Sequence, residues 1–203
     1  IGATSQIAKD LIISFHEKTD YDCFLFSRNT KRVTKNLFNR LENFRYKNLF
    51  YDSFSNEEEF DLILNFVSIV NPVPQKISGS EVFKVSESFD NMILNYLLKY
   101  PKTKYIFLSS GAVYGDIFHK PASKSSLSKF NINSFQYKDY YSISKFYLEA
   151  KHRSFETFSI VDLRVFNYFS STQDLNANFF IIDVVNALMN KKTLATSSEN
   201  IMR

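Results

Sequence analysis

The sequence predicts an α/β fold in which a parallel sheet is covered by helices on both faces. Short, β-rich apolar runs alternate with longer amphipathic stretches along the 203 residues. Most of the short runs are apolar throughout their centres, which is typical of strands buried on both faces. Such alternation favours βαβ units, and therefore parallel strands.

Each element follows from its own pattern of residues. Five segments carry the strand pattern: 22–26, 48–51, 61–66, 104–109 and 159–163. Four other segments carry the helical pattern: 5–17, 86–100, 138–155 and 178–191. In the first expected helix, Ile7, Leu11 and Phe15 recur every four residues and form one apolar stripe. Residues 120–134 are polar and rich in serine, which indicates a surface loop.

The composition is that of a globular chain, with 44% hydrophobic and 23% charged residues. No apolar run reaches the ~18 residues that a membrane span needs, and no signal peptide opens the chain. Cys23 is the single cysteine and cannot form an internal disulfide, which fits a reducing compartment. We therefore expect a cytoplasmic protein without a membrane partner.

The charge and the histidines point to neither nucleic acid nor metal. The net charge is +4, but the lysines are scattered and often stand beside acids, as on a solvated surface. The three histidines, His16, His119 and His152, lie on separate segments without metal-site spacing. We expect no metal site and no nucleic-acid partner.

A glycine-containing turn precedes the first expected helix. In "GATSQIA", small residues stand at Gly2, Ser5 and Ala8. This spacing lets the backbone approach a pyrophosphate, which the helix N-terminus then holds. Ser5 also suits an N-cap. Because two of the three positions are not glycine, an ordinary capped helix is the alternative.

The end of the next expected strand bears on the choice of dinucleotide. "FLFSRN" places Ser27 and Arg28 where such sheets usually carry an acid for the ribose hydroxyls. An arginine can instead pair with a 2′-phosphate, which favours NADP over NAD. A solvated surface arginine is the alternative.

Three segments contain a tyrosine four residues before a lysine: Tyr100–Lys104, Tyr141–Lys145 and Tyr147–Lys151. Pro101 disfavours a helix in the first segment. The other two share a helix but point about 240° apart, so only one can face the strand ends. Tyr141 lies near the helix start, reached by a loop from Ser110, which ends an apolar strand. We expect Ser110, Tyr141 and Lys145 to meet.

These three residue types suit proton transfer coupled to hydride transfer. A tyrosine with a pKa of about 10 is a poor base at neutral pH. A neighbouring ammonium stabilises the phenolate and lowers that pKa. Ser110 can hold a substrate oxygen while Tyr141 moves the proton, as hydride passes to or from a nicotinamide.

Four segments, in order, resemble the NAD-dependent epimerase/dehydratase family of the extended short-chain dehydrogenase/reductase superfamily, which acts on nucleotide sugars. "GATSQIA" resembles its Gly-x-x-Gly-x-x-Gly loop, and "SSGAVYG" its Ser-Ser-x-x-Val-Tyr-Gly strand end. "YSISK" resembles its Tyr-x-x-x-Lys, and "LRVFN", at 163–167, its Leu-Arg-x-x-Asn. The likeness covers essentially the whole chain and implies a Rossmann-type, doubly wound parallel sheet.

The resemblance also implies roles for individual residues. The catalytic residues would be Ser110, Tyr141 and Lys145. The cofactor would be lined by Gly2, Ser5, Gln6, Ile7, Arg28, Asp52, Asn65, Phe66 and Val67, together with Tyr141 and Lys145. The sugar nucleotide would be contacted by Ser110, Tyr114 and Asn167, with Phe166 near the nicotinamide.

One departure from the family bears on the reaction. Its sugar dehydratases follow the strand-end hydroxyl with Asp-Glu, which act as acid and base in water elimination. Gly111 and Ala112 stand there instead, which disfavours dehydration. We expect a nucleotide-diphosphate-sugar epimerase or a 4-keto-sugar reductase that uses NADP or, alternatively, NAD. A catalytically weak or inactive NAD(P)-binding module that kept the fold is the alternative, because the phosphate loop has one glycine where three are usual.

The two ends of the sequence suggest how the domain is divided. The chain opens at a loop-to-helix junction and stops at Arg203 without a turn signal. We expect a strand before Ile1 and more chain after Arg203. Residues 1–170 would form the dinucleotide-binding domain, and 171–203 would begin a substrate-binding part that is largely missing. The apolar segment 176–189 is a candidate homodimer contact.

Overall fold

A computed structural model of the chain describes residues 1–37, 45–55, 57–69, 79–115, 121–177 and 180–194. Two parallel sheets have the strand orders β1-β2 and β3-β4-β5. The strands are β1 (Cys23–Ser27), β2 (Tyr46–Phe50), β3 (Leu62–Asn65), β4 (Lys104–Ser110) and β5 (Ile160–Val165). The helices are α1 (Gln6–Lys18), α2 (Thr30–Leu37), α3 (Gly79–Lys99), α4 (Tyr137–His152) and α5 (Phe180–Met189), with the 3₁₀ turns η1 (Tyr51–Ser53) and η2 (Gly111–Tyr114). The predicted α/β fold with parallel strands is confirmed.

Residues 1–3 connect the two sheets near the carboxyl ends of their strands. The amino group of Ile1 donates to the Leu64 carbonyl of β3 at 2.7 Å, and its own carbonyl accepts from the Phe66 N–H. On the other side, the N–H groups of Gly2 and Ala3 both donate to the Phe26 carbonyl of β1. Ile1 therefore lies between β1 and β3, where the chain enters the loop before α1.

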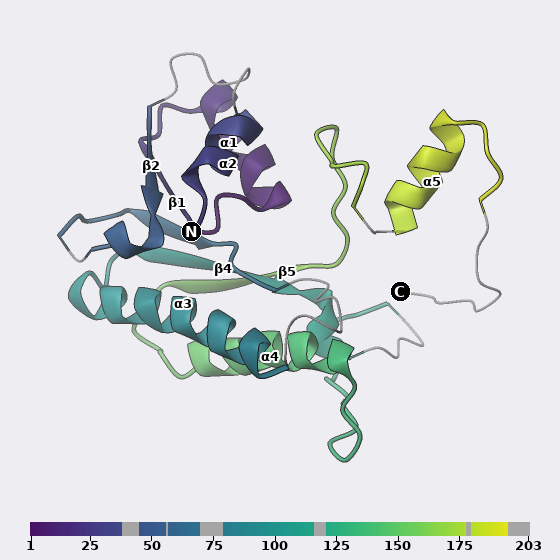
Figure 1. Cartoon of the computed structure of the whole chain (residues 1–203). Coiled ribbons are helices and arrows are strands. Elements are labelled where there is room, and N and C mark those ends of the chain that lie inside the picture. Colours follow the sequence, from purple (N-terminus) through teal and green to yellow (C-terminus); the bar gives the residue numbers. More distant parts are fainter. Residues whose placement is uncertain (38–44, 56, 70–78, 116–120, 178–179, 195–203) are drawn as a thin grey trace.

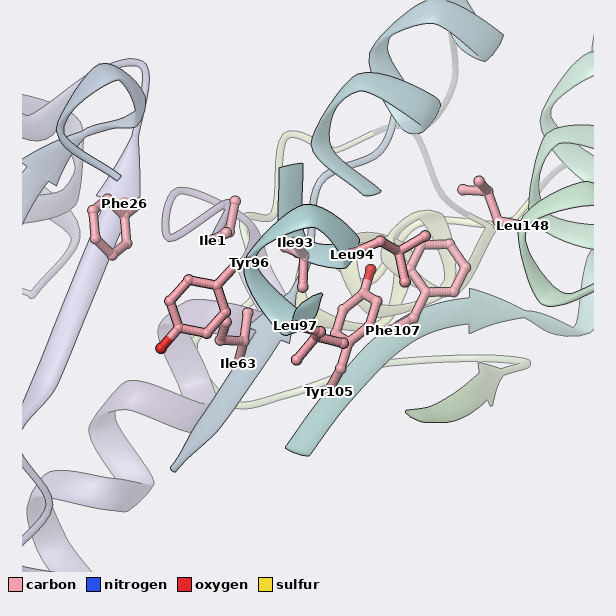
Figure 2. Packing of buried hydrophobic residues seen from close by; sticks show 10 residues of the cluster. All are labelled: Ile1, Phe26, Ile63, Ile93, Leu94, Tyr96, Leu97, Tyr105, Phe107 and Leu148. Atoms are coloured by element: carbon pink, nitrogen blue, oxygen red, sulfur yellow. The ribbon is translucent and has the colours of Figure 1, made fainter. Parts of the chain in front are cut away.

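Helices cover both faces of the strands. Figure 1 shows α1 and α2 beside β1 and β2, whereas α3 and α4 lie together below β4 and β5. Successive residues of β1 point to opposite faces. Leu25 packs in a cluster with Ala3, Ala8, Ile12, Ile13, Val33 and Leu37, the last five of which belong to α1 and α2. Phe26 packs in the larger cluster of Figure 2, with Ile1, Ile63, Ile93, Leu94, Tyr96, Leu97, Tyr105, Phe107 and Leu148.

The helix starts next to the strand ends are fixed by local hydrogen bonds. Ser5 is the N-cap of α1, and its Oγ accepts from the Ala8 N–H at 3.2 Å, as the sequence suggests. Gln136 and Asp139 form a capping box at the start of α4. Both starts are therefore well defined, which fixes the direction of the side chains in the first turn of each helix.

Two helices differ from the expectation. The sequence pattern did not predict α2, because only Val33 and Leu37 are buried among its eight residues, too few to form a long apolar stripe. Helix α3 begins at Gly79, seven residues before the predicted start at Ser86. Only Val82 is buried among residues 79–85, and it anchors this first part of the helix. The strands lie where they were predicted, with ends shifted by one or two residues.

Candidate active site

The hydroxyl groups of Ser110 and Tyr141 meet at the carboxyl end of β4. Ser110 is the last residue of β4, and its Oγ accepts from the Ala112 N–H at 3.2 Å, which fixes the side chain. Tyr141 lies in the second turn of α4, with its side chain toward that strand end. Burial raises the pKa of Tyr141, and the nearby hydroxyls of Ser110 and Ser68 act in the opposite direction. The phenol is thus neutral near pH 7 and can donate a proton.

Lys145 follows one turn later on the same face of α4. The side chain is only 1% exposed, and its Nζ donates to the Leu108 carbonyl of β4 at 2.6 Å. Nζ also lies 6.0 Å from the centre of the Tyr141 ring and 4.2 Å from that of Phe107. Burial lowers the pKa of Lys145 to about 7, although nearby carboxylates act to raise it. A small change in its surroundings can therefore change its charge near neutral pH.

The competing tyrosine–lysine pair on α4 faces another element. The phenol of Tyr147 donates to Glu87 of α3 at 2.9 Å. Lys151 donates to Asp90 of α3, also at 2.9 Å. This pair thus joins two helices, and Tyr141 and Lys145 remain the pair at the strand ends.

A buried polar network lies behind these residues. His152 stands between two carboxylates, with Nε2 2.7 Å from Asp90 and Nδ1 2.5 Å from Asp162. Although burial opposes it, the hydrogen bonds to Asp162 and Asp90 raise the pKa of His152 to about 9. The network continues from Asp90 through the Tyr105 hydroxyl to the side-chain amide of Asn65, at 3.0 Å for each step. His152 is therefore a structural histidine, held between two carboxylates.

The side chain of Asn65, which was predicted to line the cofactor, is held by partners within the protein. Its amide nitrogen is taken by Tyr105, and its Oδ1 accepts from the Val67 N–H at 2.9 Å. Asn65 instead fixes the backbone that leaves β3. Phe66 and Val67 follow, each partly buried, with their backbone against the loop at Gly2.

That loop leaves no room for a side chain at Gly2. Gly2 has a φ of +83°, and a Cβ there would lie 3.0 Å from the backbone of Phe66 and of Val67. The following first-turn amides, those of Gln6 and Ile7, have no acceptor within the helix, as at any helix N-terminus. Close backbone approach and free amides are what a pyrophosphate requires, so these residues fit a dinucleotide.

The side chain of Gln6 points to another segment. Its amide donates to Thr172 at 2.7 Å and to Ser170 at 3.3 Å, both beyond β5. Lys9 of the next turn donates to the Thr172 carbonyl at 2.9 Å. The segment after β5 is thus attached to α1, close to the predicted phosphate loop.

A tyrosine that was not predicted from the sequence lies near Arg28, in the region predicted to hold the adenosine. Arg28 is exposed just after β1, and Asp52 is exposed in η1. Burial raises the pKa of Tyr51, whereas the charge of Arg28 and a hydrogen bond from the Gly2 backbone lower it. Arg28, which follows β1, and Gly2, which precedes α1, therefore both lie close to the side chain of Tyr51.

The residues predicted to contact substrate form a second cluster. Arg164 of β5 donates to Glu149 of α4 at 2.5 Å and to the Tyr114 hydroxyl at 2.5 Å. The Tyr114 ring stacks on Phe166 with 6.2 Å between ring centres. Phe166 is 55% exposed, and Asn167 beside it is also exposed. Tyr114 and Asn167 thus lie beyond the same strand ends as Ser110.

Ser68 was missed in the sequence, although it lies beside Tyr141. Its Oγ is buried and has no partner in ordinary hydrogen-bond geometry among the described residues. The available signal was position: Ser68 comes three residues after a strand that pairs with β4. Side chains beyond the carboxyl ends of neighbouring parallel strands gather at one edge of the sheet.

Comparison with known proteins places this geometry in context. The family model described as "NAD dependent epimerase/dehydratase family" matches residues 1–201. No curated protein matches the sequence.

Several solved structures share the fold. A dTDP-glucose 4,6-dehydratase from Bacillus anthracis str. Ames, in complex with NAD, has a TM-score of 0.70 at 16% identity, covering 95% of this chain and 61% of its own. A UDP-glucuronic acid 4-epimerase from Bacillus cereus, in complex with NAD, has a TM-score of 0.68 at 17% identity, covering 95% and 63%. A UDP-N-acetylglucosamine 4-epimerase from Methanobrevibacter ruminantium M1 has a TM-score of 0.66 at 21% identity, covering 94% and 62%.

These matches confirm the Rossmann-type sheet. They also show what share of each matched structure this chain covers. It spans 61% of the first of these structures and similar shares of the others. Across the described ranges, no helix combines the length and apolar character needed to cross a bilayer. Within the same ranges, no group of three or more potential metal ligands is found.

Proposed function

This chain belongs to the NAD dependent epimerase/dehydratase family, and from that membership we propose that it acts on a nucleotide-diphosphate sugar as an epimerase or a 4-keto-sugar reductase. Tyr141 is the acid/base, Ser110 orients the reacting oxygen, and Lys145 supports the phenolate electrostatically. The nicotinamide cofactor, when bound, accepts or supplies the hydride. Sugar-nucleotide chemistry and the roles of these three residues are part of the proposal.

The observation that carries the proposal is the meeting of the Ser110 and Tyr141 hydroxyls beside buried Lys145. Ser110 comes from β4, and the other two come from α4. A hydroxyl within reach of a phenol can bind the same substrate oxygen that the phenol protonates or deprotonates. The Lys145 ammonium, inside the protein and close to the Tyr141 ring, favours the phenolate once the proton has left.

The surroundings of Gly111 argue against dehydration. A Cβ at this position would lie 2.4 Å from the Phe166 ring, which therefore occupies the space that a side chain would need. A carboxylate following Ser110 would require the ring to move. An epimerase or a reductase needs no such carboxylate, because its chemistry is confined to hydride and proton transfer.

The residues around the cofactor support NADP as the partner. Arg28 is exposed at the end of β1, where its guanidinium is available to a 2′-phosphate. Gln6 and Ile7 would hold the pyrophosphate through their backbone amides, and Gly2 and Ser5 would line its approach, since their own amides donate to the Phe26 and Gly2 carbonyls. Asp52 would lie beside the adenine. NAD is the alternative, and the two are separated by binding measurements on Arg28→Ala.

The test is turnover of candidate sugar nucleotides by the wild type and by Tyr141→Phe. Loss of the phenol proton should lower kcat by roughly 10²–10⁴-fold, with little change in KM. Tyr147→Phe is the matched control, because Tyr147 lies on the same helix and contacts Glu87 of α3. Full activity in Tyr141→Phe contradicts the proposed mechanism.

The same assay separates the two reactions. A reductase consumes reduced cofactor in proportion to product, which is followed as a fall in absorbance. An epimerase returns the hydride to the sugar, so product accumulates without net change in cofactor. If the protein binds cofactor but converts no sugar nucleotide, the remaining alternative is a nucleotide-binding module, consistent with a phosphate loop that has a single glycine.

A further inference from the structure

We propose that Ser68 is a positioning residue for Tyr141, providing a second hydroxyl that holds the phenol together with Ser110. The inference rests on the proposed acid/base role of Tyr141. It concerns a residue outside the Ser110, Tyr141 and Lys145 set, on the loop that leaves β3. Ser68 acts through Tyr141 rather than on the substrate.

The topology brings Ser68 to this position. β3 and β4 are parallel neighbours, with Asn65 opposite Phe107. Ser68 comes three residues after Asn65, and Ser110 comes three residues after Phe107. The two serines therefore leave adjacent strands at the same level, on the edge of the sheet that the Tyr141 side chain of α4 approaches.

The backbone before Ser68 is fixed from both sides. The Phe66 N–H donates to the Ile1 carbonyl at 2.9 Å, and the Val67 N–H donates to Asn65 Oδ1 at 2.9 Å. Asn65 is in turn held by Tyr105 at 3.0 Å. A hydroxyl placed on such a segment is directed rather than free to follow solvent.

The Ser68 oxygen is buried with an unused hydrogen-bonding capacity. Within the described part of the chain, Oγ has no partner in ordinary hydrogen-bond geometry. Buried hydroxyls are normally paired, so an unpaired one in a site calls for an explanation. The phenol of Tyr141 is near enough for the Ser68 hydroxyl to lower its pKa, together with Ser110.

Ser68 and Ser110 together can donate two hydrogen bonds, one to the substrate oxygen and one to the Tyr141 oxygen. A serine hydroxyl has one hydrogen to donate. Ser110 Oγ already accepts from the Ala112 N–H, and its single hydrogen cannot serve both a substrate oxygen and the Tyr141 oxygen. When Ser110 turns its hydrogen to the substrate, Ser68 can still donate to the phenolate. Ser68 thereby keeps Tyr141 oriented and favours its deprotonated form.

The charged groups around Tyr141 are independent of Ser68. Lys145 is the cation that faces the Tyr141 ring from α4. Three carboxylates act on Lys145 in turn: Asp90 of α3, Glu149 of α4 and Asp162 of β5. A substitution at Ser68 leaves all of these groups in place, so a change in Tyr141 titration reports the hydroxyl contact.

The experiment compares wild type with Ser68→Ala, using protein labelled with ¹³C at the tyrosine Cζ. The resonance of Tyr141 is the one that Tyr141→Phe removes, and its titration is followed while circular dichroism shows each variant folded. Ser68→Ala should raise the midpoint by about 0.5–1 pH unit, because a hydrogen bond to the charged form is lost. Where sugar-nucleotide turnover is measurable, the matching limb of the kcat profile should move by the same amount, without a change in KM.

Two further variants keep the result specific. Ser68→Thr retains the hydroxyl and should return the midpoint to near the wild-type value. Ser86→Ala is the matched control, because Ser86 Oγ on α3 is also buried without a partner among the described residues. It should leave the Tyr141 resonance unchanged. A Tyr141 midpoint that is the same in Ser68→Ala and wild type overturns the inference.

The outcome for Ser68 is separable from that for the proposed function. A shifted midpoint without turnover of any sugar nucleotide supports the Ser68 contact and counts against the enzyme. Turnover that requires Tyr141, with an unshifted midpoint in Ser68→Ala, supports the enzyme and overturns the role of Ser68.

Discussion

Lys145 is a base in surroundings that oppose its charge. It is 1% exposed, and burial brings its pKa down to about 7. Its Nζ donates to one backbone carbonyl, that of Leu108 at 2.6 Å. A buried amine with little pairing is costly to the fold, which is the pattern expected where function rather than stability selects a residue.

Lys145→Met should therefore separate activity from stability. Methionine has a similar length and no charge to bury, so we expect the free energy of unfolding to change by less than about 1 kcal/mol or to increase. Turnover should fall by roughly 10²-fold or more, because nothing then supports the phenolate. Urea melts and initial rates on the same samples measure both. A large loss of stability with turnover retained would mean that Lys145 is structural.

In contrast to Lys145, the buried side chain of His152 is stabilised by hydrogen bonds to two carboxylates, those of Asp90 and Asp162. Asp90 is 0% exposed, and it contacts His152, Lys151 and Tyr105. Although burial favours the neutral acid, hydrogen bonds from His152 and Lys151 lower the pKa of Asp90. Without the His152 imidazolium, the buried carboxylate of Asp90 has fewer hydrogen bonds to offset its loss of hydration.

His152→Gln should lower stability by roughly 3 kcal/mol at pH 6. The pKa of His152 is raised from 6.5 to about 9, so its contribution is fully present below pH 6.5 and is lost as the pH rises through 9. The difference between wild type and variant should shrink across that window. The lowered pKa of Lys145 makes the free energy of unfolding rise with pH. This contribution is the same in wild type and in His152→Gln, so it cancels in their difference. Urea midpoints from pH 6 to 9.5 measure the difference.

Asp22→Asn is the control for an ordinary ion pair. Asp22 lies 3.3 Å from Arg45, and both side chains are about two-thirds exposed, at 66% and 67%. The effect of Asp22→Asn should stay below about 1 kcal/mol at every pH. A gap between wild type and His152→Gln that is independent of pH would show that the imidazole contributes packing but not charge.

At the scale of residues, the sequence spacing within the motifs predicted much of the candidate site. It did not predict contacts between segments that lie far apart in the chain. The four-residue interval in Tyr141–Lys145 and the strand-end position of Ser110 were readable in the sequence. The direction of the Lys145 amine to the Leu108 carbonyl was not. Nor was Ser68, since no motif marks it and only the pairing of β3 with β4 brings it to Tyr141.

At the scale of elements, two glycines hold loops close to other segments for different reasons. Gly2, in the loop before α1, faces the backbone of Phe66 and Val67 at 3.0 Å and has a φ of +83°. Gly111, at the start of η2, faces the ring of Phe166 at 2.4 Å without a positive φ. The backbone of Phe66 and Val67 cannot move away from an added Cβ, whereas the exposed ring of Phe166 can.

Alanine substitutions should distinguish the two cases. Gly2→Ala should lower the free energy of unfolding by about 1–2 kcal/mol through the left-handed conformation alone, and Phe66→Ala should not relieve it. Gly111→Ala should lower it by about 1 kcal/mol, and the loss should vanish when Phe166→Ala is already present. Double-mutant cycles in urea measure both couplings. Recovery of Gly2→Ala by Phe66→Ala would refute the assignment of strain to the backbone.

Element prediction succeeded where burial produces a regular pattern. The strands were readable from their short apolar runs, although one face of β5 is open, with Val161 and Leu163 each 50% exposed. Helix α2 was not, because a mostly solvated sequence with two buried residues resembles a polar loop. The first two turns of α3 were not predicted either, and only Val82 is buried among residues 79–85.

At the scale of the whole molecule, the predicted cofactor residues are divided between the two sheets. Arg28 and Asp52 follow β1 and β2, whereas Asn65 ends β3, and Tyr141 and Lys145 lie on α4 beside β4. Residues 1–3 connect the sheets through backbone hydrogen bonds to Phe26, Leu64 and Phe66. A dinucleotide that reaches all of these residues must contact both sheets, so its binding should stabilise the fold as one unit.

NADPH should therefore raise the melting temperature, and Arg28 should decide its advantage over NADH. A ligand at 100 times its Kd adds about 2.7 kcal/mol, or roughly 5–10 °C for a domain of this size. Arg28→Ala should weaken NADPH binding about tenfold, which is about 1.4 kcal/mol, and should leave NADH binding unchanged. Thermal melts across a concentration series of each cofactor measure these shifts.

Lys35→Ala controls for the general loss of positive charge, because Lys35 is exposed in the last turn of α2, one element beyond Arg28. It should change neither shift by more than about 1 °C, since a solvated charge is screened over a Debye length of about 8–10 Å. Equal shifts with NADPH and NADH in the wild type would make NAD the cofactor and Arg28 a solvated residue. An absence of any shift, with Gly2 and the α1 amides intact, would mean that a single glycine is not enough for this loop to hold a pyrophosphate.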